Sequence, residues 1–229
     1  FSESVAEAAL VYAIMSLRRI DELLRNISNF RADGWGKPKK RRGLFDKSVG
    51  IIGFGSVAEH FVKLLQPFRC KIKVFTPIIS KEKLNEYKMK RADLEEIFST
   101  CDVISIHSAY NEQTHHMIDK KLLQKIKQDA VLVNTARGGI IDEAALTEEL
   151  KKGNFFAVLD VFEKEPLPSE SPLYDLENVI IMPHKGGPTP DRLKHIASAI
   201  IDEMQGFLIE GKPLKNEISK ERAFTMSFS

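Results

Sequence analysis

The feature that most constrains this chain is the stretch at residues 48–58, which reads Ser-Val-Gly-Ile-Ile-Gly-Phe-Gly-Ser-Val-Ala. Its first five residues form a short apolar, β-branched run without polar alternation, which is typical of a strand buried on both faces of a parallel sheet. Gly53 and Gly55 then permit a tight turn, and apolar residues at helical spacing follow. Strand, glycine turn and helix come in the order that a dinucleotide site needs, with the first free N–H groups of the helix facing a pyrophosphate. The third position of the fingerprint is Ala58, a substitution that it tolerates, and the fingerprint alone is a weak signal.

Beyond the glycine turn, apolar runs alternate with amphipathic segments along most of the chain. Such alternation predicts an α/β fold with a doubly wound parallel sheet and right-handed crossovers, as in Rossmann-type dinucleotide-binding domains. Further strands are predicted at residues 71–75, 103–107, 130–134, 155–159 and 179–182, and helices at 81–87, 94–98, 120–126 and 142–152.

The N-terminal part predicts one long helix over residues 4–28, which Ser4 and Glu7 would open as a capping box. The first half of this helix is apolar nearly all round, so a second domain or another subunit must cover it. We therefore expect a homodimer that associates through residues 4–28. The basic run at 39–42 has no aromatic residues within it, which favours a solvated loop at 31–42 over a nucleic-acid or localisation patch.

The last clear element is a helix that begins at Pro190, with Thr189 as its N-cap, and stops at Gly211. Apolar residues recur through it at helical spacing. Residues 212–229 show no periodicity, which favours a tail or a strap onto another surface.

Charge and composition exclude several classes of function. The chain has 229 residues, with 34 Lys+Arg against 32 Asp+Glu, so it lacks the basic excess of a nucleic-acid or membrane-surface binder. No apolar run is long enough to span a bilayer. Cys70 and Cys101 lack metal-ligand spacing and, without a signal peptide, are expected to be reduced thiols. We therefore expect no metal site and a cytoplasmic location.

Three polar groups stand at the ends of predicted strands, where the ligands of open α/β sheets bind. Arg137 follows a buried strand and precedes two glycines, where its planar fork suits bidentate capture of a carboxylate. Glu165 follows the next strand, and His184 follows the one after it. A carboxylate partner would hold the histidine in its protonated form as a usable acid. Each residue taken alone could also have a role outside catalysis. Arg137 would then anchor a phosphate or a loop, Glu165 would be a surface acid, and His184 would cap the last helix.

Five separated motifs resemble, in order and spacing, the D-isomer-specific 2-hydroxyacid dehydrogenases. They cover almost the whole chain: Val-Ala-Glu at 5–7, the glycine turn at 49–55, Asn-Thr-Ala-Arg-Gly-Gly at 134–139, Leu-Asp-Val-Phe at 159–162 with Glu165-Pro166, and Pro183-His184. The resemblance implies hydride transfer between a nicotinamide dinucleotide and a 2-keto or D-2-hydroxy acid. In that family the arginine holds the substrate's carboxylate and carbonyl, the histidine exchanges a proton with the substrate oxygen, and the glutamate tunes and orients the histidine. These catalytic roles would fall to Arg137, His184 and Glu165.

The same resemblance implies a cofactor site in which Asp160 contacts the nicotinamide amide. The expected cofactor-binding residues are Gly53, Gly55, Ser56, Val57, Thr76, Ala109, Thr114, Thr135, Ala136, Arg137, Asp160, His184 and Gly187. NAD is expected, and NADP stays open because Thr76 stands where the family usually carries an acid on the adenosine ribose. No arginine directly follows Thr76 to attract a 2′-phosphate, and Lys81 is the nearest cation after it in the sequence. Residues 109–114 also depart from the family's usual sequence, so the adenine pocket is expected to differ in shape.

Members of the family carry most of a smaller substrate domain ahead of the helix at which this chain starts. We therefore expect a dinucleotide-binding domain at residues 1–188 and, at 189–229, a helix and tail that belong to the otherwise missing domain. With one wall of the substrate cleft absent, the chain as given would bind cofactor without being a complete catalyst.

Two alternatives resemble the same family. The C-terminal-binding-protein corepressors bind a dinucleotide and act through protein contacts, but their pattern has a tryptophan shortly after the histidine, where this chain has Gly186 and Gly187. Formate and phosphite dehydrogenases act on a different acid, and Glu165 counts against a formate dehydrogenase because those enzymes lack it. The residues favour an enzyme of 2-hydroxy acids.

Overall fold

The seven strands of the described residues lie in one parallel sheet. The computed structural model describes residues 1–25, 27, 41–214, 217–218 and 220, and the strand order is β3-β2-β1-β4-β5-β6-β7. The strands are β1 (Ser48–Ile52), β2 (Lys71–Phe75), β3 (Lys90–Arg91), β4 (Val103–Ile106), β5 (Val131–Asn134), β6 (Phe156–Leu159) and β7 (Val179–Ile181). The winding reverses between β1 and β4, at the switch point where doubly wound sheets bind their ligands. The predicted doubly wound α/β fold is confirmed.

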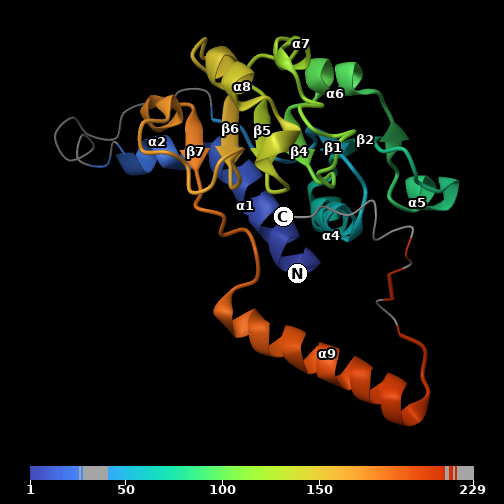
Figure 1. Ribbon diagram of the computed structural model, residues 1–229. Helices are drawn as coiled ribbons and strands as arrows, with labels where there is room; N and C mark the ends of the chain where they lie inside the picture. The colour runs from blue at the N-terminus through green and yellow to red at the C-terminus, as the bar shows by residue number, and fades with distance from the viewer. Residues whose placement is uncertain (26, 28–40, 215–216, 219, 221–229) are drawn as a thin grey trace.

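Helices cover both faces of the sheet (Figure 1). On one face lie α1 (Ser2–Arg18) and α4 (Ser56–Leu65), and on the other lie α6 (Leu94–Thr100), α7 (Lys120–Leu123) and α8 (Glu143–Leu150). The other helices are α2 (Ile20–Arg25), α5 (Lys81–Glu86) and α9 (Pro190–Glu210), with short 3₁₀ turns η1 (Gln66–Phe68), η2 (Gly138–Ile140) and η3 (Pro172–Asp175).

Strand residues point alternately into two cores, which explains why their sequences lack polar alternation. Val131 and Val133 of β5 belong to the core under α1 and α4, whereas Leu132 belongs to the core under α6, α7 and α8. Each of these side chains is fully buried and contributes about 1.5–3 kcal/mol to folding by leaving water. Gly50 lets α6 approach β1 closely, since a Cβ there would lie 2.3 Å from Ile97 Cγ2.

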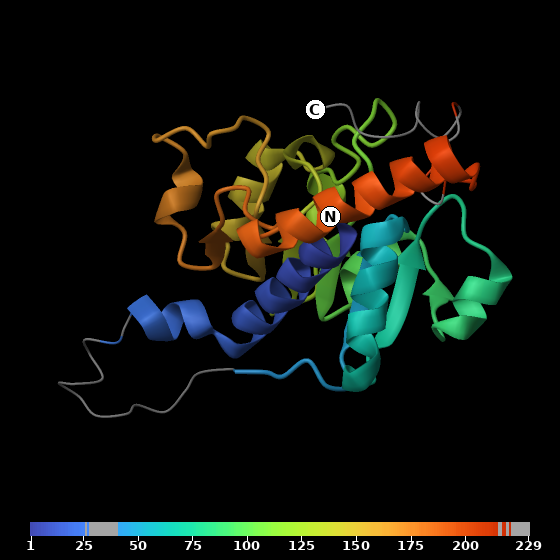
Figure 2. The same cartoon turned by 90° about the horizontal axis from the view of Figure 1, so that it is seen from below.

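The single helix predicted over residues 4–28 is wrong. α1 stops before Arg19, which adopts a left-handed conformation with φ 55° and donates its N–H to the carbonyls of Met15 and Ser16. The guanidinium of Arg19 lies over the Phe156 ring, 3.6 Å from its centre. This tertiary contact holds the chain in the turn, and α2 leaves in a new direction (Figure 2).

The predicted capping box is also wrong. α1 begins at Ser2 with Phe1 as its N-cap, so Ser4 and Glu7 lie inside the helix. The loop predicted at 31–42 lies outside the described residues except for its last two positions.

Most other predicted elements are confirmed with shifted ends. The helix predicted at 120–126 is shorter, since α7 ends at Leu123 and a turn follows. The strand β3 went unpredicted because Lys90 and Arg91 are two exposed, charged residues without apolar periodicity.

The C-terminal helix is confirmed, from Thr189 as N-cap to Gly211, which ends it with φ 64°. α9 stands clear of the sheet layers in Figure 1, and none of its residues is buried. Large apolar side chains are exposed along it, among them Ile201, Phe207 and Leu208. The tail predicted at 212–229 falls largely outside the described residues.

Candidate active site at the carboxyl edge of the sheet

The predicted site residues all follow strands at the same edge of the sheet. Because every strand pair is parallel, the carboxyl ends of the strands share that edge. The predicted residues are Gly53, Gly55, Ser56 and Val57 after β1, Thr76 after β2, Ala109 and Thr114 after β4, Thr135, Ala136 and Arg137 after β5, Asp160 and Glu165 after β6, and His184 and Gly187 after β7.

The glycine turn after β1 leaves the head of α4 open. Gly53 has φ 86°, its N–H donates to the Phe75 carbonyl at 2.8 Å, and a Cβ there would lie 2.6 Å from Ser108 backbone atoms. At Gly55, the N-cap of α4, a Cβ would meet nothing within 4 Å, and no side chain caps the helix. The first N–H groups of α4 are therefore available to an anion such as a pyrophosphate.

Thr76 is buried directly after β2, and its hydroxyl donates to the Ile78 carbonyl at 3.3 Å. Arg91, which the sequence analysis did not single out, reaches this turn from β3. Its guanidinium donates to the carbonyl oxygens of Thr76 at 3.4 Å and Ile79 at 3.1 Å. No sequence signal links these positions, because the pairing of β2 with β3 brings them together.

The loop after β4 is closed upon itself and tied to its neighbours. The Thr114 hydroxyl donates to the Ala109 carbonyl at 2.8 Å and accepts the Asn111 N–H at 2.8 Å. Farther along, His116 Nε2 lies 2.7 Å from Glu163 Oε1, in the loop after β6. Ala109 and Thr114, two of the predicted cofactor-binding residues, thus lie in a loop that is fixed by its own hydrogen bonds and by a contact with the loop after β6.

The turn after β5 combines rigid backbone with unpaired side chains. Asn134 accepts the Ala136 N–H and donates to the Arg137 carbonyl, each at 3.0 Å. The buried Thr135 hydroxyl has no hydrogen-bond partner. Gly138 packs directly on the next loop, since a Cβ there would lie 1.9 Å from the Phe162 carbonyl carbon.

Arg137 is half-buried, and its Nη1 donates to the carbonyl of Ala136 at 2.7 Å. No carboxylate of the described residues pairs with its guanidinium. The charge is therefore held in place while most of its donors stay available to an anionic ligand.

His184 and Glu165 form the pair that the sequence predicted. His184 Nδ1 lies 2.6 Å from Glu165 Oε2, and Glu165 Oε1 accepts the Phe162 N–H at 3.0 Å. About half of the imidazole side chain is exposed, and its Nε2 has no partner in the described part of the chain. A carboxylate on Nδ1 makes Nε2 the nitrogen that can exchange a proton with a ligand.

Asp160 is 2% exposed and anchors the loop that follows β7. Its Oδ1 accepts the Lys185 N–H at 2.8 Å and the Tyr12 hydroxyl at 3.4 Å, while Oδ2 accepts the Gly186 N–H at 2.7 Å. Burial, together with the charge of Asp160, raises the pKa of Tyr12 to about 12, which keeps its hydroxyl a donor. Tyr12 was missed because its contact joins α1 to residues far along the chain. The expected contact of Asp160 with nicotinamide stays a prediction.

Three observations fit a dinucleotide at this edge: the open space at Gly55, the uncapped head of α4 and the orphaned hydroxyl of Thr135. Gly187 is open in the same way as Gly55. A cavity of about 730 Å³ lies elsewhere, between α2, η3 and β7, and contains none of the predicted residues.

Metal ligation and membrane insertion find no support within the described ranges. No group of three or more His, Cys, Asp or Glu side chains there could hold a metal ion. None of the described helices has the length and apolar character needed to cross a bilayer.

Known proteins share both the sequence and the fold. D-3-phosphoglycerate dehydrogenase of Archaeoglobus fulgidus is 32% identical over 219 residues, which cover 94% of this chain and 41% of the relative. Hydroxypyruvate reductase of Thermotoga maritima is 34% identical over 205 residues, covering 88% of this chain and 65% of the relative. The chain thus spans less than half the length of the first relative and about two thirds of the second.

Solved structures agree with the sequence relatives. D-mandelate dehydrogenase of Rhodotorula graminis matches with a TM-score of 0.83 and 25% identity over 96% of this chain and 66% of its own. D-lactate dehydrogenase of Lactobacillus jensenii, solved with NAD⁺, matches with a TM-score of 0.80 and 26% identity over 96% of this chain and 69% of its own.

A family model described as "D-isomer specific 2-hydroxyacid dehydrogenase, NAD binding domain" matches residues 10–186. This range contains the glycine turn, Arg137, Glu165 and His184, and it confirms the expectation of NAD as cofactor. The chain therefore belongs to the D-isomer-specific 2-hydroxyacid dehydrogenase family, of which it carries the NAD-binding domain.

Proposed function

We propose that this chain supplies the cofactor-binding part and the catalytic acid of an oxidoreductase that moves a hydride between NAD and a 2-keto or D-2-hydroxy acid. The observation that carries the proposal is the contact of 2.6 Å between His184 Nδ1 and Glu165 Oε2. It lies on the same sheet edge as Arg137, which has no acidic partner among the described residues. This acid–base pair favours an enzyme over the corepressor alternative, which needs no proton transfer.

The three catalytic residues divide the work by their chemistry. Bound NAD supplies or accepts the hydride. Arg137 would hold the substrate carboxylate through two parallel N–H···O bonds. His184 would give a proton from Nε2 to the substrate oxygen during reduction and take it back during oxidation. Glu165 would fix the orientation of the ring by accepting a hydrogen bond from Nδ1.

We propose that the remaining predicted residues line the cofactor. The open backbone at Gly55 and Gly187 and the unpaired Thr135 hydroxyl support this assignment. Asp160 would also act as a positioning residue, because it holds the backbone of Lys185 and Gly186 directly after the catalytic histidine.

The names of the relatives suggest which substrates to test first. They include phosphoglycerate dehydrogenases, a glyoxylate reductase and hydroxypyruvate reductases. We propose that the substrate is a small 2-keto or 2-hydroxy acid of this kind. A single arginine that binds one carboxylate selects for the acid group and does not discriminate among the remaining groups of the substrate.

We further propose a division into a dinucleotide-binding domain at 1–188 and a C-terminal element at 189–229 that docks on a substrate domain. The exposed apolar side chains of α9 support this division. A homodimer through α1 is proposed on similar grounds, since Val11 remains 46% exposed while the opposite side of α1 is buried. Sedimentation that gives a monomer at all accessible concentrations would refute the dimer. A cytoplasmic location stays a prediction.

The test of the proposed reaction is NADH oxidation by the complete gene product on a panel of glyoxylate, hydroxypyruvate and related 2-keto acids. His184→Gln should lower kcat by about a hundredfold or more, the usual contribution of a positioned general acid, with NADH affinity within a few fold of the parent. His60→Gln is the matched control, because His60 is a half-buried histidine of α4 outside the predicted site residues. Turnover by the His184 variant at the parent rate would refute the proposal.

A further inference from the structure

The cation of Arg91 lies against the turn where the adenosine ribose is expected, and no sequence motif indicates it. Lys81 is the nearest cation to Thr76 in the sequence in the direction of α5. In the structure, Arg91 of β3 pairs in register with Val74, two residues before Thr76. The pairing of β2 with β3 thus places an arginine beside the turn at residues 76–79, whose own sequence contains no arginine.

The side chain of Arg91 reaches forward along the sheet to this turn. Its Nη1 lies 3.4 Å from the Thr76 carbonyl oxygen and its Nη2 lies 3.1 Å from that of Ile79. The two contacts bracket the segment from Thr76 to Ile79. They leave further guanidinium N–H donors uncommitted, because arginine carries five.

The charge of Arg91 has no acidic partner in the part of the chain that the structure describes. The side chain is exposed to solvent. The nearby Asp93 caps α6 by accepting the Glu96 N–H at 2.7 Å. The turn itself carries Thr76, Pro77, Ile78 and Ile79, with no acid to repel a phosphate.

We infer that Arg91 sets the selectivity at the adenosine 2′ position, so that the chain binds the 2′-phosphate of NADP as well as the free 2′-hydroxyl of NAD. A guanidinium that already borders the turn can donate charge-assisted hydrogen bonds to a phosphate. The Thr76 hydroxyl donates to the Ile78 carbonyl, so it would act toward either ribose as a hydrogen-bond acceptor, and being uncharged it does not repel the phosphate. The inference rests on dinucleotide binding at this edge and extends it to the choice between the two cofactors.

Equilibrium titration of NADH and NADPH, followed by their fluorescence, tests the inference without any turnover. Arg91→Gln should raise the dissociation constant of NADPH about tenfold or more, the usual loss when a charged hydrogen bond disappears. The dissociation constant of NADH should stay within about threefold, because the 2′-hydroxyl gains little from the charge. Added salt should narrow the difference, because screening weakens exposed charges.

Two variants separate charge from structure. Lys90→Gln removes a positive charge from the neighbouring exposed position of β3, which points to the opposite face of the strand, and should leave the ratio of the two dissociation constants unchanged. Arg91→Lys keeps the charge and should retain part of the NADPH affinity that Arg91→Gln loses.

The outcomes distinguish this inference from cofactor binding itself. If Arg91→Gln weakens NADH and NADPH equally, the arginine only supports the turn, and the selectivity role is wrong while dinucleotide binding stands. If the parent chain binds NADH but shows no measurable NADPH binding, the inference is wrong in the same way. If it binds neither, the cofactor assignment fails, and the inference fails with it.

Discussion

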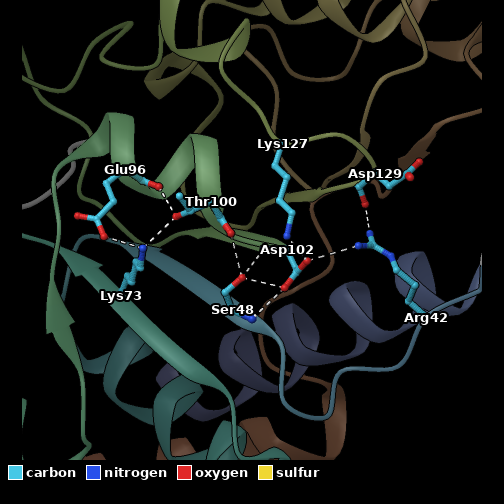
Figure 3. A network of polar contacts seen from close by, with 8 residues as sticks. All are labelled: Arg42, Ser48, Lys73, Glu96, Thr100, Asp102, Lys127 and Asp129. Atoms are coloured by element: carbon cyan, nitrogen blue, oxygen red, sulfur yellow. Dashed lines mark hydrogen bonds and ion pairs between the residues drawn. The ribbon is translucent and has the colours of Figure 1, made fainter.

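The two edges of the sheet differ in whether their polar side chains have hydrogen-bond or ion-pair partners within the chain. At the amino edge, Asp102 stands directly before β4, and its carboxylate is surrounded by donors (Figure 3). It accepts the N–H and the hydroxyl of Ser48 at 3.0 and 2.8 Å and pairs with Lys127 at 2.7 Å and Arg42 at 3.5 Å. Arg42 also donates to the Asp129 carbonyl. This cluster ties together the segments that enter β1, β4 and β5.

A second cluster of polar contacts, formed with residues of α6, adjoins the first through Ser48. Lys73 Nζ donates to Glu96 Oε1 at 2.6 Å and Thr100 Oγ1 at 3.0 Å, and Ser48 Oγ lies 3.1 Å from the Thr100 carbonyl oxygen. Within these two clusters, protein groups pair with the charged side chains of Arg42, Lys73, Glu96, Asp102 and Lys127. These two clusters therefore satisfy their polar groups from within the chain, whereas Asp21 Oδ1 of α2, beyond them, is buried without a hydrogen-bond partner among the described residues.

The carboxyl edge does not satisfy its polar groups in this way. Among the described residues, the Thr135 hydroxyl and Nε2 of His184 have no hydrogen-bond partner, the guanidinium of Arg137 has no acidic partner, and the head of α4 has no side-chain cap. A buried polar group left without a hydrogen bond costs about 1–3 kcal/mol. The comparison teaches that one edge stabilises the fold, while the other retains unpaired groups that a ligand can complete.

The largest effects on catalysis and stability should come from replacing one arginine at each edge by glutamine. Arg137→Gln should lower kcat/KM by about a hundredfold or more, roughly 3 kcal/mol of transition-state stabilisation, because a charged contact becomes neutral. Its melting temperature should stay near that of the parent, since Arg137 bonds only its neighbour's carbonyl. Arg42→Gln should do the reverse and leave kcat/KM unchanged while lowering stability by about 1 kcal/mol. Steady-state kinetics and thermal unfolding of both variants check this, and equal effects of both on stability would erase the contrast.

Two glycines of the carboxyl edge should separate packing from binding. Gly138→Ala should destabilise the fold by about 3 kcal/mol, because the added Cβ would lie 1.9 Å from the Phe162 backbone and overpacking is costly. Gly55→Ala should leave stability almost unchanged, since its Cβ meets nothing within 4 Å, yet weaken NAD binding by filling the space ahead of α4. Urea unfolding and NADH titration measure the two effects. Full NADH affinity in Gly55→Ala would show that the space is not used.

Asp102 tests the amino edge and its pH dependence. Burial raises the pKa of this carboxyl, but the hydrogen bonds from Lys127 and Ser48 lower it more, so the folded-state pKa lies below the usual value. Such a group stabilises the fold fully above its unfolded pKa of about 4, and the contribution is lost as pH falls through the folded-state value. Asp102→Asn should therefore be about 2 kcal/mol less stable at pH 7, with the gap closing below about pH 4. Denaturant unfolding across pH measures the gap, and a gap that grows toward acid pH would contradict this sign.

The smallest effect is expected on α9. Ile201→Ser should change the unfolding free energy of the chain by no more than about 0.5 kcal/mol, because the side chain is 61% exposed and no residue of α9 is buried. Thermal unfolding checks this, with Ile104→Ser in the buried core of β4 as a control that should be strongly destabilised. A large effect at Ile201 would mean that α9 belongs to the sheet unit and that the proposed division is wrong.

The sequence sufficed for the sheet and for most of the carboxyl edge because both depend on local patterns. Buried strands such as Ser48–Ile52 are apolar throughout, and the functional side chains follow them directly. The turn at Arg19 could not be predicted, since the Phe156 ring beneath it is distant in sequence. Arg91 was missed for the same reason, because only the pairing of a two-residue strand brings it to Thr76.

Anchoring contacts of the site were also hidden from the sequence. The resemblance to the dehydrogenase family implied the partnership of Glu165 with His184, and the two residues follow adjacent strands. No pattern indicated that Asp160 would be buried and hold the N–H groups of Lys185 and Gly186 with help from Tyr12. Such contacts join α1, β6 and β7, and only the packed fold determines them.

Amide hydrogen exchange with and without saturating NAD tests the contrast between the edges most directly, because it reads both edges in one experiment. We predict that NAD slows exchange at the head of α4 and in the loops after β4, β5 and β7, including Thr135 and Gly187. Amides at the amino edge, such as those of Ser48 and Asp102, should exchange at unchanged rates. Protection confined to the amino edge, or no protection at the head of α4, would contradict the account.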